Sequence, residues 1–331
     1  MAMQLKLPAA FSMVACLVLG SAAASPAQVL GDVSGYPKRP IRIVIGFTPG
    51  GQPDIYSRMI GTKLTESMGQ QIVVDNRPGA GGAIGSKIVA DANPDGYTLL
   101  SVSSSHVILP SVRKLPYDVR KAFSGITTTY STSYLLVVPP SLGVKTAQEL
   151  IALAKAKPGQ LNFASAGAGS GTHFAAEMLK EAARIDAVHV PYKGIPEALN
   201  DTMTNRVQFF MAPLASSVNL VRDGKLRALG VSSTKRISIH PDIPTIAESG
   251  LPGFSWDSWG GILAPAKTPR AIINKLNREI TRVLELPDIQ QRMHALGADP
   301  APRTPEAFDK FVAEQLGVIS TLAKKAGITP Q

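Results

Sequence analysis

Gly46-Phe-Thr-Pro-Gly-Gly-Gln-Pro-Asp54 and Ser165-Ala-Gly-Ala-Gly-Ser-Gly-Thr-His173 are the two stretches of the chain that decide its fold. Each follows a short apolar run of the kind that forms a buried strand, Ile41–Ile45 in the first case and Leu161–Ala164 in the second. Each also precedes a segment with helical spacing of apolar residues. Glycine-rich turns between a strand and a helix are typical of parallel βαβ units. The sequence therefore predicts an α/β protein with one such unit near the start of each half.

The alternation of strand and helix continues outward from both stretches. Further strands are predicted at 71–75, 97–102, 134–138, 188–192, 207–211 and 226–231. The last helices begin at Thr268-Pro269 and Thr304-Pro305, where a capping threonine precedes a proline. These helices have no strands of their own, so their simplest packing is against the first lobe. We predict two lobes, formed by residues 36–137 plus 257–331 and by residues 138–256, joined by crossings near Val137 and Trp256.

Residues 1–27 have the layout of a secretory signal peptide. Lys6 is their one charge, an apolar run covers 11–19, and small residues fill 20–27. The alternative, a membrane anchor, needs an apolar run of about 20 residues, and this one is shorter. Cys16 is the one cysteine, so cleavage after Ala24 or Ala27 leaves a chain without disulfides. We predict export to the periplasm.

The charge balance is basic but dispersed. The chain has 34 Lys and Arg against 24 Asp and Glu, and removing Lys6 with the signal leaves 33 − 24 = +9. No run of five basic residues occurs and aromatic residues make up 6%, so the sequence offers little for stacking on nucleic acid bases. We interpret the excess as a soluble surface that attracts anions.

The two glycine-rich turns are candidate anion sites. A helix N-terminus presents unpaired N–H groups and about half a positive charge, which favours a carboxylate or phosphate. Ser165, Ser170 and Thr172 add hydroxyl donors to the second turn. In open α/β sheets ligands bind beyond the carboxyl ends of strands, where both turns are expected. Alternatively, each is simply a tight turn that needs glycine.

Enzymatic alternatives fit less well. Gly50-Gly51 after a strand, with Asp75 ending the next strand, imitates half of an NAD site, but the Gly-x-Gly-x-x-Gly pattern is missing. The five histidines are dispersed without metal-ligand spacing, and no correctly framed nucleophile motif occurs. We therefore predict no catalytic residues, no metal and no cofactor. His106, after Ser103-Ser-Ser105, and His173 either line a cleft or pack and cap.

Several motifs together resemble the Bug proteins, the substrate-binding components of tripartite tricarboxylate transporters. The resemblance covers residues 36 to 328 in order. The matching motifs are Tyr36-Pro-Lys-Arg-Pro-Ile-Arg-Ile-Val44, Gly46-Phe-Thr-Pro-Gly-Gly51, Val74-Asp-Asn-Arg-Pro-Gly-Ala-Gly-Gly82, Pro94-Asp-Gly-Tyr-Thr-Leu-Leu100, Leu115-Pro-Tyr-Asp118, Leu161-Asn-Phe-Ala-Ser-Ala-Gly167, Val190-Pro-Tyr-Lys-Gly194, Gly224-Lys-Leu-Arg-Ala-Leu229 and Ala264-Pro-Ala-Lys-Thr-Pro269.

The resemblance implies a two-lobed periplasmic binding protein of the Venus-flytrap type, with a ligand cleft between the lobes. It implies that backbone amides and ordered waters at the two glycine-rich turns grip a ligand carboxylate. Carried over by position, the site residues are Phe47, Thr48, Gly50, Gly51 and Asp54 in the first lobe and Ser165, Ala166, Gly169, Ser170 and His173 in the second. Ser103 and His106, at the end of a predicted strand, and Ala212 are added as further candidates. Asp54 is expected to anchor the helix start, because a carboxylate repels an anion unless water intervenes.

One departure from the family pattern bears on the ligand. Many members read Met-Phe-Asp where this chain has Phe210-Met211-Ala212. The family's Asp faces a ligand amino group, so Ala212 predicts a non-amino carboxylate, aromatic or dicarboxylic, against an apolar wall of Phe47, Met211 and Ala212. The expected function is solute capture by a monomer that serves membrane transporter subunits. The alternatives are an NAD-linked exported enzyme and a ligand-sensing receptor for a signalling partner.

Overall fold

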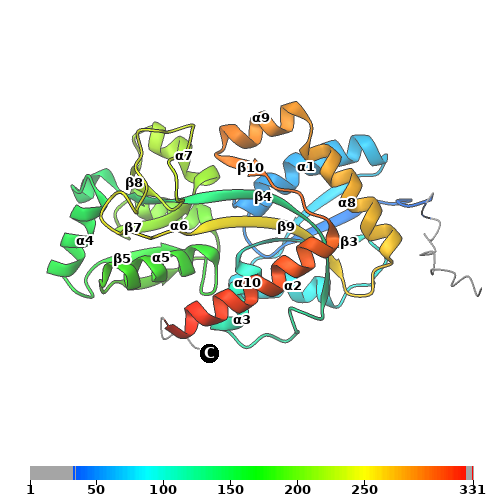
Figure 1. Ribbon diagram of the computed structural model, residues 1–331, viewed down its shortest axis with the longest axis horizontal. Coiled ribbons are helices and arrows are strands. Elements are labelled where there is room, and N and C mark those ends of the chain that lie inside the picture. The colour runs from blue at the N-terminus through cyan, green and yellow to red at the C-terminus, as the bar shows by residue number, and fades with distance from the viewer. Residues whose placement is uncertain (1–32, 34, 326–329, 331) are drawn as a thin grey trace, which may run out of the picture. The chain divides into compact units, whose positions relative to one another are not determined.

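The computed structural model describes residues 33, 35–325 and 330 (Figure 1). The predicted signal peptide at 1–27 lies outside the described residues. Within the described part of the chain, no helix combines the length and the apolar character that crossing a membrane requires.

The first half of the fold is built on a mixed sheet. Its strands β2, β1 and β3 are parallel neighbours in that order, and β9 then pairs antiparallel with β3. The N-terminal part of β4 pairs with β9, and the short β10 pairs with β4. The strands of this sheet are β1 (Ile41–Ile45), β2 (Ile72–Asn76), β3 (Thr98–Ser103), β4 (Phe123–Val138), β9 (Asp257–Pro265) and β10 (Ala298–Pro300).

Helices cover both faces of this sheet because its strands are apolar on both sides. Ile41 and Ile43 of β1 pack in one core with the helices on one face, whereas Val44 packs in the core on the opposite face. This alternation follows from the two-residue period of a strand. The first core includes α1 (Gln52–Met68), α8 (Arg270–Leu284) and α9 (Pro287–Ala295), and the second includes α2 (Ala83–Ala90), α3 (Ser105–Val112) and α10 (Pro305–Lys325).

The second half repeats the design. The C-terminal end of β4 pairs with β7 and β8, and β5 lies in parallel between β7 and β6. The further strands are β5 (Asn162–Ser165), β6 (Val188–Pro191), β7 (Phe209–Pro213) and β8 (Arg227–Val231). One face packs against α4 (Ala147–Ala156) and α5 (Gly171–Ala183), and the other against α6 (Ile195–Met203) and α7 (Leu214–Arg222).

The two halves are the lobes of the fold, and β4 runs through both (Figure 1). Ser133 pairs with Asp257 of β9, and the next residue, Tyr134, pairs with Pro213 of β7. The sequence predicts a strand only at 134–138, because the preceding part of β4 is rich in Ser and Thr and has no apolar run. The residue ranges given above for the two lobes stay a prediction.

Candidate functional site

A small cavity lies between the lobes, at the two glycine-rich turns. Its volume is about 30 Å³. Gly51 caps the N-terminus of α1, and Ser170 caps that of α5 through a hydrogen bond from the His173 N–H to its Oγ at 3.2 Å. The lining residues are Phe47, Gly51, Gln52, Pro53, Ser103 and Tyr134, together with Ala166, Ser170, Gly171, Thr172, Ile195 and Pro213. Two helix N-termini thus meet one cavity, which gives it a positive electrostatic character.

Asp54 holds the first turn in shape from inside the protein. Its side chain is buried and accepts hydrogen bonds from the Gly50 N–H at 3.0 Å and from Arg58 Nε at 3.0 Å. Burial raises the pKa of the Asp54 carboxyl, but these hydrogen bonds outweigh it and hold that pKa below its usual value. Asp54 does not line the cavity, so its position matches the expected role of anchor.

Replacing Asp54 by Ala should lower the free energy of unfolding by about 1–3 kcal/mol, because two charge-assisted hydrogen bonds are lost and the Gly50 N–H is left without an acceptor. Urea denaturation at neutral pH measures this change. Asp91→Ala is the control, since Asp91 pairs with Lys87 on the surface and should cost less than about 0.5 kcal/mol. Equal stability of the Asp54→Ala and Asp91→Ala proteins would contradict the anchoring role.

The second turn is tied together by hydroxyl groups and backed by aromatic rings. Ser165 Oγ accepts from the Gly167 N–H at 3.0 Å, and Thr172 Oγ1 accepts from the Ala166 N–H at 2.9 Å. His189 Nε2 lies 2.6 Å from Ser165 Oγ, and its ring stacks on that of His173 with centroids 4.1 Å apart. The second turn therefore rests on two imidazoles.

Both imidazoles are neutral supports. Burial is the largest cause that lowers the pKa of both rings, and the pKa of His189 falls to about 3. The neighbouring Lys180 also disfavours the protonated form of each ring, and His173 does the same for His189. His189 lies on β6, 24 residues after Ser165, and no local sequence pattern marks it as part of the site. His173 Nδ1 accepts from the Gly169 N–H at 3.3 Å, so His173 supports the turn from behind.

The lobes touch at the edges of the cavity. Ser216 Oγ of the second lobe donates to the Gly50 carbonyl at 3.0 Å, and Thr48 Oγ1 donates to Glu197 at 3.4 Å. The backbones of Gly81 and Ala168 approach so closely that a Cβ on Gly81 would lie 2.3 Å from the Ala168 carbonyl oxygen. A cavity of about 30 Å³ has room for about one water molecule. In this arrangement the cavity is smaller than a dicarboxylate.

The structure divides the predicted site residues into two groups. The residues that line the cavity are Phe47, Gly51, Ser103, Ala166 and Ser170. Those that do not are Thr48, Gly50, Asp54, His106, Ser165, Gly169, His173 and Ala212. Ala212 and Met211 lie in the cores on opposite faces of the second sheet, and the next residue, Pro213, reaches the cavity instead.

His106 is buried in the first lobe beside Phe123, with ring centroids 5.3 Å apart. It faces a separate cavity of about 10 Å³. Burial lowers the pKa of His106 to about 4, and its Nε2 has no hydrogen-bond partner among the described residues. The structure therefore places His106 in the packing of the first lobe.

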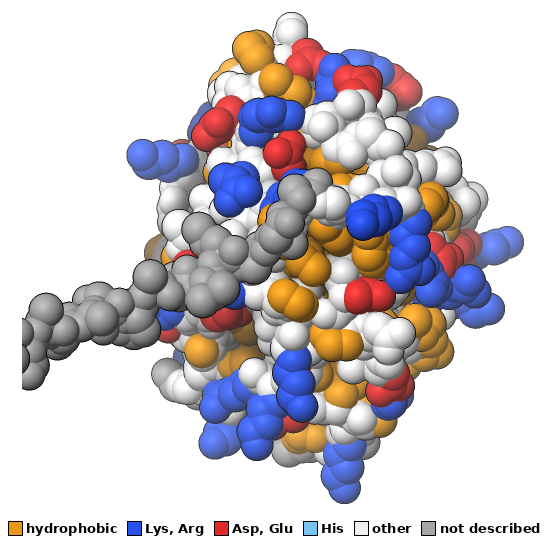
Figure 2. Space-filling view, turned by 90° about the vertical axis from the view of Figure 1, so that its right-hand side faces the viewer, with side chains coloured by type: hydrophobic (Ala, Val, Ile, Leu, Met, Phe, Trp, Pro, Cys, Tyr) orange, Lys and Arg blue, Asp and Glu red, His pale blue; other side chains and the backbone are white. Residues whose placement is uncertain are grey.

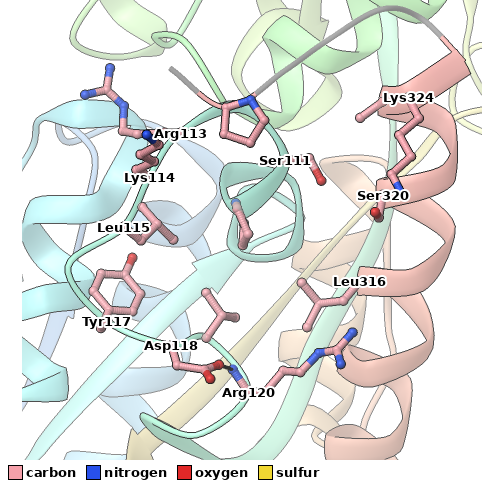
Figure 3. Close-up of a pocket in the computed structure, with 14 residues that line it drawn as sticks. Ser111, Arg113, Lys114, Leu115, Tyr117, Asp118, Arg120, Leu316, Ser320 and Lys324 are labelled. Atoms are coloured by element: carbon pink, nitrogen blue, oxygen red, sulfur yellow. Dashed lines mark hydrogen bonds between the residues drawn. The ribbon is translucent and has the colours of Figure 1, made fainter.

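Other surface features share no residue with the cleft. A larger groove of about 550 Å³ lies between the segment 110–120 and the C-terminal half of α10, where Arg113, Lys114 and Arg120 surround an apolar floor (Figure 3). Basic side chains are also spread over the face shown in Figure 2, interspersed with acidic ones. Asp75, the acid that an NAD site would use to bind a ribose, accepts hydrogen bonds from Arg42 and Arg77.

The chain is similar to known proteins over most of its length. The model of the tripartite tricarboxylate transporter family receptor matches residues 56–328. Protein BugT of Bordetella pertussis is 34% identical over 297 residues, 88% of this chain and 90% of BugT. Rpa4515 of R. palustris, in a structure with adipate, has 32% identity and a TM-score of 0.87 over 89% of this chain and 100% of that one. MatC from Rhodopseudomonas palustris with bound malate has 30% identity and a TM-score of 0.81 over 86% and 99%.

The two-lobed fold predicted from the sequence is thus confirmed, as is the resemblance to the Bug proteins. The chain belongs to the receptor family of the tripartite tricarboxylate transporters.

Proposed function

We propose that this chain is a periplasmic receptor that binds a small, non-amino organic carboxylate between its lobes, as a monomer, and delivers it to membrane transporter subunits without changing it chemically. The observation that carries the proposal is the meeting of the α1 and α5 N-termini at one cavity between the lobes. Two positive helix ends stabilise an anion without a basic side chain.

The lining of the cavity supports a carboxylate without an amino group. The described residues that line it include no Asp or Glu, so an ammonium group would be buried without an anionic partner. Burying an unpaired charge is costly. The lining also includes no Lys or Arg, so the anion would be held by N–H groups, hydroxyls and an amide. Adipate and malate, which accompany the two structural relatives, are carboxylates of this non-amino class.

The contact between the lobes supports a capture mechanism. In the open form the ligand reaches one turn, and closure brings the other turn against it and excludes water. Binding then shifts the population toward the closed form by the ligand's differential affinity for it. The closed form is what membrane subunits would distinguish from the empty receptor. The described lining contains no cysteine, lysine or histidine to act as a nucleophile or base, which favours binding without reaction.

A thermal-shift panel with matched ligand pairs tests this proposal. Succinate and adipate should raise the melting temperature by roughly 5 °C at about 100-fold excess over Kd, whereas aspartate and glutamate should leave it unchanged. The matched comparison is succinate with aspartate, which differ by the amino group. A shift with aspartate or glutamate alone would refute the non-amino assignment, and no shift with any carboxylate would refute the proposed function.

A further inference from the structure

Gln52 is the first residue of α1 and one of the most buried polar residues of the chain, with 3% of its surface exposed. It lines the cavity between the lobes. Its Oε1 accepts a hydrogen bond from Ser258 Oγ at 3.0 Å. Its Nε2 is buried and has no hydrogen-bond partner among the described residues. Buried donors of this kind are nearly always satisfied, so this one calls for an acceptor.

The other polar groups of the lining are already engaged within the protein. Ser103 Oγ lies 3.0 Å from Ser105 Oγ. Ser170 Oγ lies 2.9 Å from Thr172 Oγ1, and each also accepts a backbone N–H. Tyr134 Oη lies 3.5 Å from Ser104 Oγ. Gln52 is thus the lining side chain with an unused N–H donor, and a donor of this type recognises an oxygen acceptor.

Building on the proposed function, we infer that Gln52 determines specificity: its Nε2 donates a hydrogen bond to a second oxygen-bearing group of the ligand, separate from the carboxylate held at the α5 end. Gln52 opens α1, so the same helix N-terminus adds its partial positive charge beneath that group. The ligand class is then a carboxylate with a second oxygen acceptor at its other end. A plain alkyl monocarboxylate leaves the Gln52 N–H unsatisfied and binds more weakly.

The test is isothermal titration calorimetry with two pairs of probes, succinate with butyrate and adipate with hexanoate. Native protein should bind the diacid of at least one pair more tightly than the monoacid. Gln52→Met keeps the length and burial of the side chain but removes the donor. It should weaken binding of that diacid by about tenfold to 100-fold and change binding of the monoacid by less than about threefold.

Two further variants test the same position with a different side chain and provide a surface control. Gln52→Glu replaces the donor by an anionic acceptor, so it should weaken diacid binding more than Gln52→Met does. Gln291→Met makes the same substitution on the exposed surface of α9 and should leave all affinities unchanged. Melting temperatures confirm that each variant is folded. If native protein binds a carboxylate but Gln52→Met weakens diacid and monoacid equally, or neither, the inference is overturned while the proposed function stands. If native protein binds none of the four probes, the proposed function itself fails.

Discussion

Gly81→Ala should prevent the lobes from closing fully and weaken binding of succinate or adipate by about tenfold to 100-fold. A Cβ at this position would lie 2.3 Å from the carbonyl oxygen of Ala168 on the opposite lobe, and a backbone atom cannot move aside as a flexible side chain does. The closed form therefore carries an overpacking cost of about 1–3 kcal/mol that the open form does not. Small-angle scattering should show a larger radius of gyration, and calorimetry the loss of affinity.

The chain provides a control with nearly the same backbone. Gly81 has φ = +66° and Gly69 has φ = +67°, so alanine is equally strained at both. A Cβ on Gly69 has no neighbour within 4 Å. Gly69→Ala should therefore lose some stability but keep the native scattering curve and the native affinity. If the two variants bind equally well, the Gly81–Ala168 contact does not limit closure.

Acidification from pH 7 to pH 5 should lower the free energy of unfolding by about 2–4 kcal/mol. Burial holds the pKa of His106 at about 4 and that of His189 at about 3, whereas both rise to about 6.5 in the unfolded chain. The unfolded state therefore takes up protons first. Above pH 6.5 the neutral histidines cost the folded protein nothing. As the pH falls from 6.5 toward their pKa values in the folded protein, each histidine lowers the free energy of unfolding by up to about 1.4 kcal/mol per pH unit. Asp257 and Asp309, whose pKa burial raises, act in the opposite direction.

Urea denaturation across this pH range measures the slope, and two variants assign it. His106→Leu removes a buried titrating group, and His189→Phe keeps a ring that stacks on His173 and Phe163. Each substitution should reduce the slope of the free energy of unfolding against pH by about 1 kcal/mol per pH unit below pH 6.5. If the free energy of unfolding falls with pH as steeply in both variants as in the native protein, other groups cause the acid sensitivity.

Much of the fold follows from local patterns in the sequence. The strands before the two turns are short, apolar and β-branched, and the turns contain glycines that adopt positive φ, such as Gly50 at +87° and Gly167 at +107°. These signals are local, so the sequence predicts the turns and the helices that follow. The N-terminal part of β4 escapes prediction because its Thr and Ser side chains become buried only when α8, α10 and the segment 301–303 pack over them.

The cavity is less predictable, because its lining depends on directions of side chains that tertiary packing sets. Phe47 and Ser170 could be predicted as lining residues because they belong to the two glycine-rich turns. No local pattern marks Gln52, whose contact with Ser258 of the distant β9 forms only in the folded protein. His189 likewise has no spacing relation to Ser165 until β5 and β6 pair. Ala212 is one residue away from the cavity because alternate strand residues face opposite sides of the sheet.

The continuity of β4 has a mechanical consequence. Because β4 and β9 stay hydrogen-bonded up to the Ser133–Asp257 pair, and Ser232 binds both Tyr134 and Trp256 just beyond it, the joint between the lobes is a two-stranded ribbon. Bending such a ribbon strains many hydrogen bonds a little, so the ribbon resists bending along its whole length. A single loop, in contrast, can rotate about a few backbone bonds with little resistance. We expect a modest opening angle and rapid spontaneous return, so that the empty receptor samples its shut form without a ligand to draw it there.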